Sequence, residues 1–296
     1  MDPLFRSVYV GLACTTGGRW SNGHGRLLHA ALFNAVARVD PALARRLHDQ
    51  PDFRPFTVAV VGGVAYGTQP VDLQRGATLD VRITSIDDQL SRALDDVLAE
   101  LGSSAVHLGR TVFQVDALAR SPSEHPSAVS APATRLSEFW LHEQSAAVKP
   151  DVRTTVRFLT PTTFRHQGEN VPLPLPSLLF ARLRRAWNAI GVAEIDPLLG
   201  IRIADQCTIT GYSLHTLQVP LAPRSIQSAF IGECEYEIAR TDEEARRAAQ
   251  LLLDFGFFAG IGYKTSMGLG AIAPVQRSVV RQRRGSPSAM PSATPR

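Results

Sequence analysis

Cysteine and long apolar runs are scarce in this 296-residue sequence. The three cysteines, Cys14, Cys207 and Cys234, stand far apart and form no CxxC pair, so they indicate neither a disulfide framework nor a zinc site. No stretch approaches the roughly 18 apolar residues that cross a bilayer, and the start MDPLFRSVYVGLA lacks the basic and apolar regions of a signal peptide. We therefore expect a cytoplasmic protein with no membrane partner.

Lysine is also nearly absent, because Lys149 and Lys264 are the only lysines among 31 basic residues. The formal net charge is +4, and residues 277–296 hold five arginines and no acid, so the rest of the chain carries about −1. This basic tail is rich in Ser and Pro, and we expect it to be disordered. The basicity of the whole chain is therefore no argument for a nucleic-acid partner, which must be argued from local sites.

The apolar pattern of the first half predicts the element order βαββαβ. Segments rich in β-branched and apolar residues indicate strands, and apolar residues at helical spacing indicate helices. The predicted strands cover 4–15, 56–66, 78–86 and 105–115, the helices cover 24–39 and 87–101, and residues 41–49 form a short helical turn.

The second half repeats this order after a segment, 121–134, that is rich in Ser, Pro and Ala and reads as a linker. Thr241 and Glu244 form a capping box that predicts the start of the last helix. The predicted strands cover 156–165, 201–214, 226–238 and 270–275, and the helices cover 176–191 and 242–258.

We therefore predict an α+β fold of two tandem ferredoxin-like (RRM-like) βαββαβ domains, because each half has helices that can cover one face of a sheet. The first domain is expected at 1–147, including the linker region 121–147. The second is expected at 148–276 and contains a glycine-rich loop at 260–270. The disordered basic tail is expected at 277–296.

The glycine-rich loop is the most specific local motif. It is not a Walker A loop, since Tyr263 stands where a glycine must precede Lys264, and it does not open a helix as a dinucleotide motif should. Backbone N–H groups and a lysine between glycines suit a polyphosphate chain, although a turn without a ligand is the alternative. The candidate RNA-binding residues of this loop are Gly260, Gly262, Lys264, Thr265, Ser266, Gly268 and Gly270.

The pattern GhGxxxxxGhG near the end of a tandem ferredoxin-like chain resembles the sixth numbered family of CRISPR-associated proteins. These are RAMP-superfamily endoribonucleases that cut repeat RNA, or pre-crRNA, into guide units. Segments 24–59, 159–188 and 229–238 are similar to the first helix and its following segment, the opening of the second domain and a later strand of that family. The resemblance implies metal-independent cleavage that leaves a 2′,3′-cyclic phosphate and a 5′-hydroxyl, with no cofactor.

The resemblance also implies roles for three residues. The segment LARRLHDQPDFRPFT places a functional histidine at His48 and a basic residue at Arg54. Histidine suits proton transfer, whereas Arg54 stays charged and would stabilise the phosphate. The family's aromatic hydroxyl falls on Phe33, which can neither donate nor accept a proton.

Helical geometry raises a competitor on the first helix, where Arg26, His29 and Phe33 form a strip beside the apolar face. Some members of the resembled family carry the catalytic histidine on this helix, so His29 either replaces the lost hydroxyl or is itself the principal acid–base group. Arg26 is a candidate RNA contact. Arg182, Arg184 and Arg185 either line a phosphate groove or merely keep their helix soluble.

No metal site is expected, because His107, His125, His142, His166 and His215 lack metal-ligand spacing. The predicted function is cleavage of CRISPR repeat RNA. The alternatives are a catalytically inactive repeat-binding protein, which Phe33 makes credible, and an interaction scaffold that binds no RNA. A CRISPR effector complex and a second copy of the chain are further candidate partners.

Overall fold

The structure is a computed structural model that describes residues 2–50, 53–121, 123–124, 134–144, 150–191, 193–222 and 225–277, with backbone alone at 141–144 and 276–277. Most of the predicted linker lies outside the described residues, and so does the predicted tail beyond Arg277. The domain limits at 147/148 and 276/277 therefore stay predictions. No helix in the described ranges is long and apolar enough to cross a membrane.

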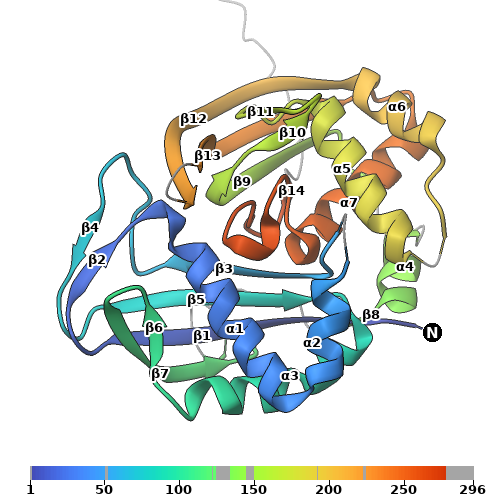
Figure 1. Cartoon of the computed structure of the whole chain (residues 1–296). Helices are drawn as coiled ribbons and strands as arrows, with labels where there is room; N and C mark the ends of the chain where they lie inside the picture. The colour runs from blue at the N-terminus through green and yellow to red at the C-terminus, as the bar shows by residue number, and fades with distance from the viewer. Residues whose placement is uncertain are drawn as a thin grey trace, which may run out of the picture.

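The first domain is an antiparallel sheet in the order β3-β5-β1-β7-β6, with helices on one face. Figure 1 shows α1 and α2 in front of this sheet. Alternate residues of the strands, such as Val8, Val10 and Leu12, point into a core shared with the helices. The elements are β1 (Leu4–Cys14), β2 (Gly18–Trp20), the 3-10 turn η1 (Asn22–His24), α1 (Gly25–Val39), α2 (Pro41–His48), β3 (Phe56–Gly62), β4 (Val71–Leu73), β5 (Thr78–Ser85), α3 (Asp88–Gly102), β6 (Val106–Leu108) and β7 (Thr111–Ala119).

The second domain has a four-stranded sheet in the order β12-β13-β9-β14. Its core joins Phe158 and Tyr236 of the sheet to Trp187 and Phe255 of two helices. The elements are β9 (Arg153–Thr162), β10 (Phe164–His166), β11 (Glu169–Val171), α5 (Pro176–Ile190), α6 (Pro197–Gln206), β12 (Cys207–Ala222), β13 (Ser225–Ile238), α7 (Glu243–Ala259), the 3-10 turn η2 (Thr265–Met267) and β14 (Gln276–Arg277).

The predicted α+β fold class is confirmed. When the four principal strands of each half are numbered along the chain, both sheets have the order 2-3-1-4, with the first and third strands central. The long crossover helices α1, α3, α5 and α7 follow the first and third strands, as the βαββαβ pattern requires. The segments rich in β-branched and apolar residues therefore located the central strands correctly.

Four local predictions are wrong. The last strand is predicted at 270–275 but forms as β14 at Gln276–Arg277, with a single bridge at Ile272. Residues 201–206 belong to helix α6 rather than to a strand, because Asp196 caps the helix at the N–H of Leu198 and Pro197 fills its first position. The predicted linker contains β8 (Thr134–Arg135), which pairs with β1, and α4 (Leu136–Gln144), which packs on α7. The cap of α7 is Asp242, which accepts from the N–H of Ala245 at 2.9 Å, and not Thr241.

Helix α7 packs against both domains, and the core cluster that contains it also includes Phe5 and Ile86 of the first domain. Its Phe258 carbonyl accepts a hydrogen bond from Thr84 of β5 at 2.6 Å, and its Phe258 ring lies 5.3 Å from that of Phe5 of β1. The buried guanidinium of Arg82 stacks 4.3 Å from the centroid of Phe257. The sheet face of the first domain that its own helices leave open is thus covered by the second domain.

We predict that Phe258→Ala lowers the free energy of unfolding by about 3 to 5 kcal/mol, because it removes a ring that joins both cores and leaves a cavity. Chemical denaturation measures this change. Leu198→Ala is the control: this side chain is 74% exposed, so its loss should change stability by no more than about 0.5 kcal/mol. Equal effects of the two substitutions would contradict the shared-core interpretation.

Candidate functional site

The glycine-rich loop lies between the two domains, where Figure 1 shows it as the red segment between β3 and β9. Its backbone is tied to the second domain: Tyr263 N–H donates to the carbonyl of Thr163 at 2.8 Å, and Gly270 N–H donates to that of Pro161 at 3.0 Å. On its other side the loop touches α1 so closely that a Cβ on Gly268 would lie 2.6 Å from the Cα of Gly25. The loop therefore fixes where the first helix begins.

Thr265 and Ser266, two of the candidate RNA-binding residues of this loop, are buried. Both are at most 6% exposed, because the loop is wedged between two domains rather than lying open. Lys264 is partly exposed and has the left-handed backbone angle φ +60°, which is uncommon for a residue with a side chain. The assignment of these residues to RNA binding stays a prediction, and it now rests chiefly on Lys264. The loop glycines Gly260, Gly262, Gly268 and Gly270 are also buried.

Helix α1 carries His29 one turn after Gly25, on the face that meets the loop. The Nδ1 atom of His29 lies 2.8 Å from the carbonyl oxygen of Ser266. A carbonyl oxygen can only accept, so Nδ1 must carry the proton of this hydrogen bond. In the neutral ring, Nε2 is then the unprotonated nitrogen.

Arg54 meets the other side of the His29 ring. Its Nη1 atom lies 3.3 Å from Nε2 of His29, and its Nη2 atom donates to the backbone carbonyl of His48 at 3.4 Å. Its guanidinium carbon lies 6.0 Å from the ring centroid of Phe33. The structure thus brings together the four residues that the sequence singled out.

The environment of His29 favours the neutral ring. Burial lowers the pKa of His29 to about 4; the Ser266 carbonyl opposes this shift, and the neighbouring Arg54, His48 and Lys264 add to it. At neutral pH the imidazole is therefore unprotonated at Nε2. A group in this state is able to accept a proton from a substrate.

His48 and Phe33 occupy the outer side of this group. His48 is the last residue of α2 and is exposed, and its ring lies edge-on to Phe33 at 6.4 Å. Phe33 also contacts His29 at 4.7 Å between ring centroids. Phe33 therefore acts as an apolar wall between two histidines and offers no group for proton transfer.

The arginines that the sequence proposed as RNA contacts differ in burial and in their contacts with the loop. Arg182 donates from Nε to the carbonyl of Gly262 at 3.1 Å and stacks over Phe53, and burial lowers its pKa to about 10. Arg185 and Arg26 are exposed on α5 and α1. Arg182 thus holds the loop in place, whereas the two exposed arginines have no such structural role.

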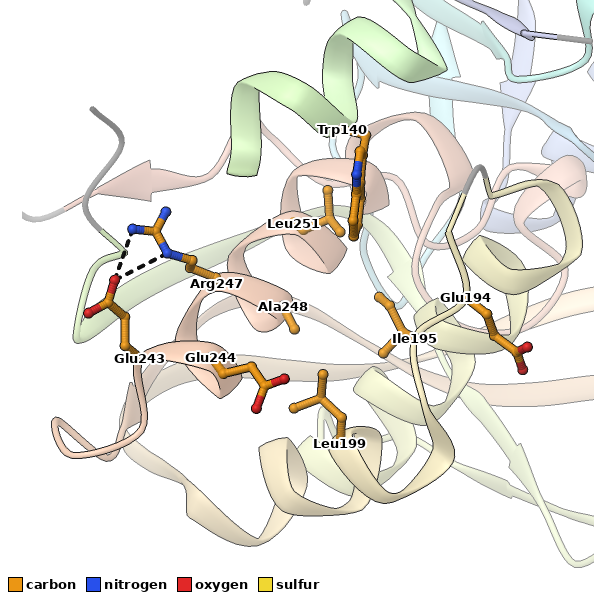
Figure 2. Close-up of a pocket in the computed structure, with 9 residues that line it drawn as sticks. All are labelled: Trp140, Glu194, Ile195, Leu199, Glu243, Glu244, Arg247, Ala248 and Leu251. Atoms are coloured by element: carbon orange, nitrogen blue, oxygen red, sulfur yellow. Dashed lines mark hydrogen bonds and ion pairs between the residues drawn. The ribbon is translucent and has the colours of Figure 1, made fainter. Parts of the chain in front are cut away.

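A separate cleft of about 430 Å³ lies between α4, α6 and α7 (Figure 2). Its lining includes the apolar side chains of Trp140, Ile195, Leu199 and Leu251, and its charged residues are Glu194, Glu243, Glu244 and Arg247. Glu243 forms an ion pair with Arg247, and Glu244 forms one with Arg202, so the charges around this cleft are of both signs. The described residues contain no group of three or more His, Cys, Asp or Glu side chains that could hold a metal ion.

Sequence reasoning missed two partners of this site. The Ser266 carbonyl is a backbone group, and no residue type announces its direction. Phe56 of β3 stacks on His29 at 5.7 Å between ring centroids, but its position in the core pattern gave no sign of a second contact. The sequence signal that could have indicated this contact is the segment RPFT, residues 54–57, which contains both Arg54 and Phe56.

The second half of the chain is similar to one family of known proteins. The family model of the CRISPR-associated endoribonuclease Cas6 matches residues 156–272. The Cas6 protein of Mycobacterium tuberculosis is 35% identical over 130 residues, which is 42% of this chain and 40% of that protein. The Cas6 protein of Streptococcus thermophilus is 30% identical over 125 residues, which is 42% of this chain and 51% of that protein. The matches thus span about half the length of these relatives or less.

Solved structures extend the similarity to nearly the whole chain. A product complex of Thermus thermophilus Cas6 superposes with a TM-score of 0.73 at 26% identity, covering 93% of this chain and 100% of that one. A second Cas6 product complex, at 24% identity and a TM-score of 0.70, covers 91% and 98% and supports the fold alone. Over residues 156–272 the chain is thus similar to the CRISPR-associated endoribonuclease Cas6, and over nearly its whole length it has the fold of a Cas6 structure.

Proposed function

We propose that this protein is an endoribonuclease that cleaves CRISPR repeat RNA (pre-crRNA) to guide RNA in the cytoplasm. The observation that carries the proposal is the neutral His29, whose unprotonated Nε2 faces the guanidinium of Arg54 at 3.3 Å. A base beside a fixed positive charge is the arrangement that attack by a ribose hydroxyl on the adjacent phosphate requires.

The proposed reaction needs no metal. His29 Nε2 takes the proton of the 2′-hydroxyl, and the 2′-oxygen attacks the phosphorus. The bond from phosphorus to the 5′-oxygen breaks, and that oxygen leaves with a proton supplied by an acid. The products are a 2′,3′-cyclic phosphate and a 5′-hydroxyl.

Arg54 is proposed to stabilise the negative charge of the pentacoordinate phosphorane. Its guanidinium keeps its charge throughout the working pH range, so it serves as an electrostatic group and not as the acid. In the free protein the Arg54 guanidinium donates a hydrogen bond to the lone pair of His29 Nε2. A bound phosphate would compete for the same guanidinium and expose Nε2 to the 2′-hydroxyl.

His48 is the proposed acid. It is exposed beside Phe33, and its backbone carbonyl already holds Arg54, so its ring lies on the open side of the same group. An exposed histidine can take a new proton from solvent after each turnover. This arrangement gives the two histidines separate duties and replaces the hydroxyl that Phe33 lacks.

The binding of repeat RNA is supported by the relatives. Similar Cas6 proteins have been solved as product complexes and, in one case, with a substrate mimic. We propose that Lys264, Arg26 and Arg185 contact the phosphates of such an RNA around the loop. A CRISPR effector complex and a second copy of this chain remain proposed partners.

Loss of catalysis is the second candidate function, and Phe33 is the observation that favours it. An inactive protein of the same shape would bind repeat RNA and protect it without cutting. Incubation of the wild-type protein with labelled repeat RNA in EDTA separates the two: cleavage supports the enzyme, and tight binding without cleavage supports the inactive binder.

We predict that His29→Ala lowers the single-turnover cleavage rate by about 10²-fold or more, because a positioned proton-transfer group contributes 10² to 10⁴ in rate. His48→Ala should cost a smaller factor, since water can replace an exposed acid. Repeat affinity, measured by filter binding, should change little in both. Wild-type rates in both folded variants would show that neither histidine does the chemistry.

The pH dependence of cleavage should reveal which histidine is the base. With a base pKa of about 4, the rate should not fall between pH 7 and pH 5, because His29 stays unprotonated throughout this range. A base with the ordinary histidine pKa of about 6.5 would lose more than about tenfold over the same interval. Single-turnover rates at subsaturating protein measure this, and a tenfold fall would exclude His29.

We predict that Lys264→Asn weakens repeat binding and lowers the slope of log affinity against log salt by roughly one unit, as expected for one lost phosphate contact. Asn accepts the left-handed conformation at this position, so the loop should keep its shape. Arg153→Gln is the control, because it removes one positive charge from the ion pair with Glu237 on the second sheet. Equal salt slopes for the two variants would contradict the role of Lys264.

A further inference from the structure

We propose that the backbone carbonyl of Ser266 is a positioning group of this site, held at its distance by the contact between Gly25 and Gly268. It orients the His29 ring and fixes the tautomer in which Nε2 is free to act as a base. The proposal rests on the proposed function of His29. It gives the glycine-rich loop a task that differs from phosphate binding.

The tautomer follows from the two partners of the ring. On one side the Ser266 carbonyl can only accept a hydrogen bond, and on the other side the Arg54 guanidinium can only donate. Of the two neutral tautomers, only the one protonated at Nδ1 satisfies both contacts. The doubly protonated ring would point an N–H group at the guanidinium and would add a charge beside Arg54, His48 and Lys264, so the site also disfavours the cation.

The Ser266 carbonyl has a fixed position because the loop is closed on itself. Ser266 is 6% exposed and lies in η2, where Met267 N–H donates to the carbonyl of Lys264 at 2.9 Å. The loop ends are joined by the hydrogen bond from Ile261 N–H to the carbonyl of Gly270 at 2.8 Å. The His29 side chain thus meets an acceptor that cannot move away without opening the loop.

The helix that carries His29 is held against the same loop. Gly25 precedes His29 by four residues, so the two lie on one face of α1. A Cβ at Gly25 would lie 2.6 Å from the Cα of Gly268, and it would meet the carbonyl of Met267 even more closely. A methyl group at Gly25 must therefore push α1 and the loop apart and lengthen the hydrogen bond from His29 to Ser266.

The wild-type protein gives the first test, without RNA. Nitrogen-15 NMR of histidine-labelled protein at pH 7 reports which ring nitrogen carries the proton, with His29→Gln used to assign the signal. We expect His29 to be protonated at Nδ1 and unprotonated at Nε2. A predominant Nε2–H tautomer would overturn the proposal, whatever the variants do.

The second test is Gly25→Ala, with Gly67→Ala as the matched control because a Cβ at Gly67 meets nothing within 4 Å. For folded Gly25→Ala we expect a mixture of His29 tautomers and a single-turnover rate about 10²-fold lower, with repeat affinity nearly unchanged, since a misplacement of about 1 Å costs that much. Gly67→Ala should match the wild type. A folded Gly25→Ala variant with the wild-type tautomer and rate would overturn the proposal.

The two tests also separate this proposal from the proposed function. If the wild type has the Nδ1–H tautomer but does not cut repeat RNA, the endoribonuclease assignment fails. If it cuts RNA while His29 carries its proton on Nε2, the positioning role of Ser266 fails and the enzyme stands. If Gly25→Ala does not fold, the wild-type spectrum still decides the tautomer.

Discussion

The approach of α1 to the glycine-rich loop is the constraint on which the rest of the site depends. Two backbones meet at Gly25 and Gly268, and neither position has room for a side chain. The contact sets the distance between a helix of the first domain and a carbonyl of the second. His29, Arg54 and His48 come from one domain, yet the group that orients His29 comes from the other.

Burial and charge act together around this contact. Burial lowers the pKa of His29, and the neighbouring Arg54, His48 and Lys264 lower it further. Three aromatic rings pack on the site: Phe33 beside the guanidinium of Arg54, Phe53 beside that of Arg182, and Phe56 on the ring of His29. This combination keeps a histidine neutral where an open surface would allow it to be charged.

Much of this could be read from the sequence, and the missing parts share a physical reason. Apolar, β-branched segments located the central strands. The segment LARRLHDQPDFRPFT singled out His48 and Arg54, and helical spacing along the first helix singled out His29. Residues 201–206 were predicted as a strand because Ile201 and Ile203 alternate with polar residues. They form part of helix α6, whose start is stabilised by the N-cap Asp196. The Ser266 carbonyl was invisible because its direction depends on the fold of a loop and not on a side chain.

The position of α7 has a consequence for how the molecule can be divided. Helix α7 is apolar around most of its circumference, because Phe255 faces the core of its own domain while Phe257 and Phe258 meet the strands of the other. Cutting the chain between its halves would expose both surfaces to water. The two ferredoxin-like halves should therefore melt in one cooperative transition, and neither half should be soluble when expressed alone.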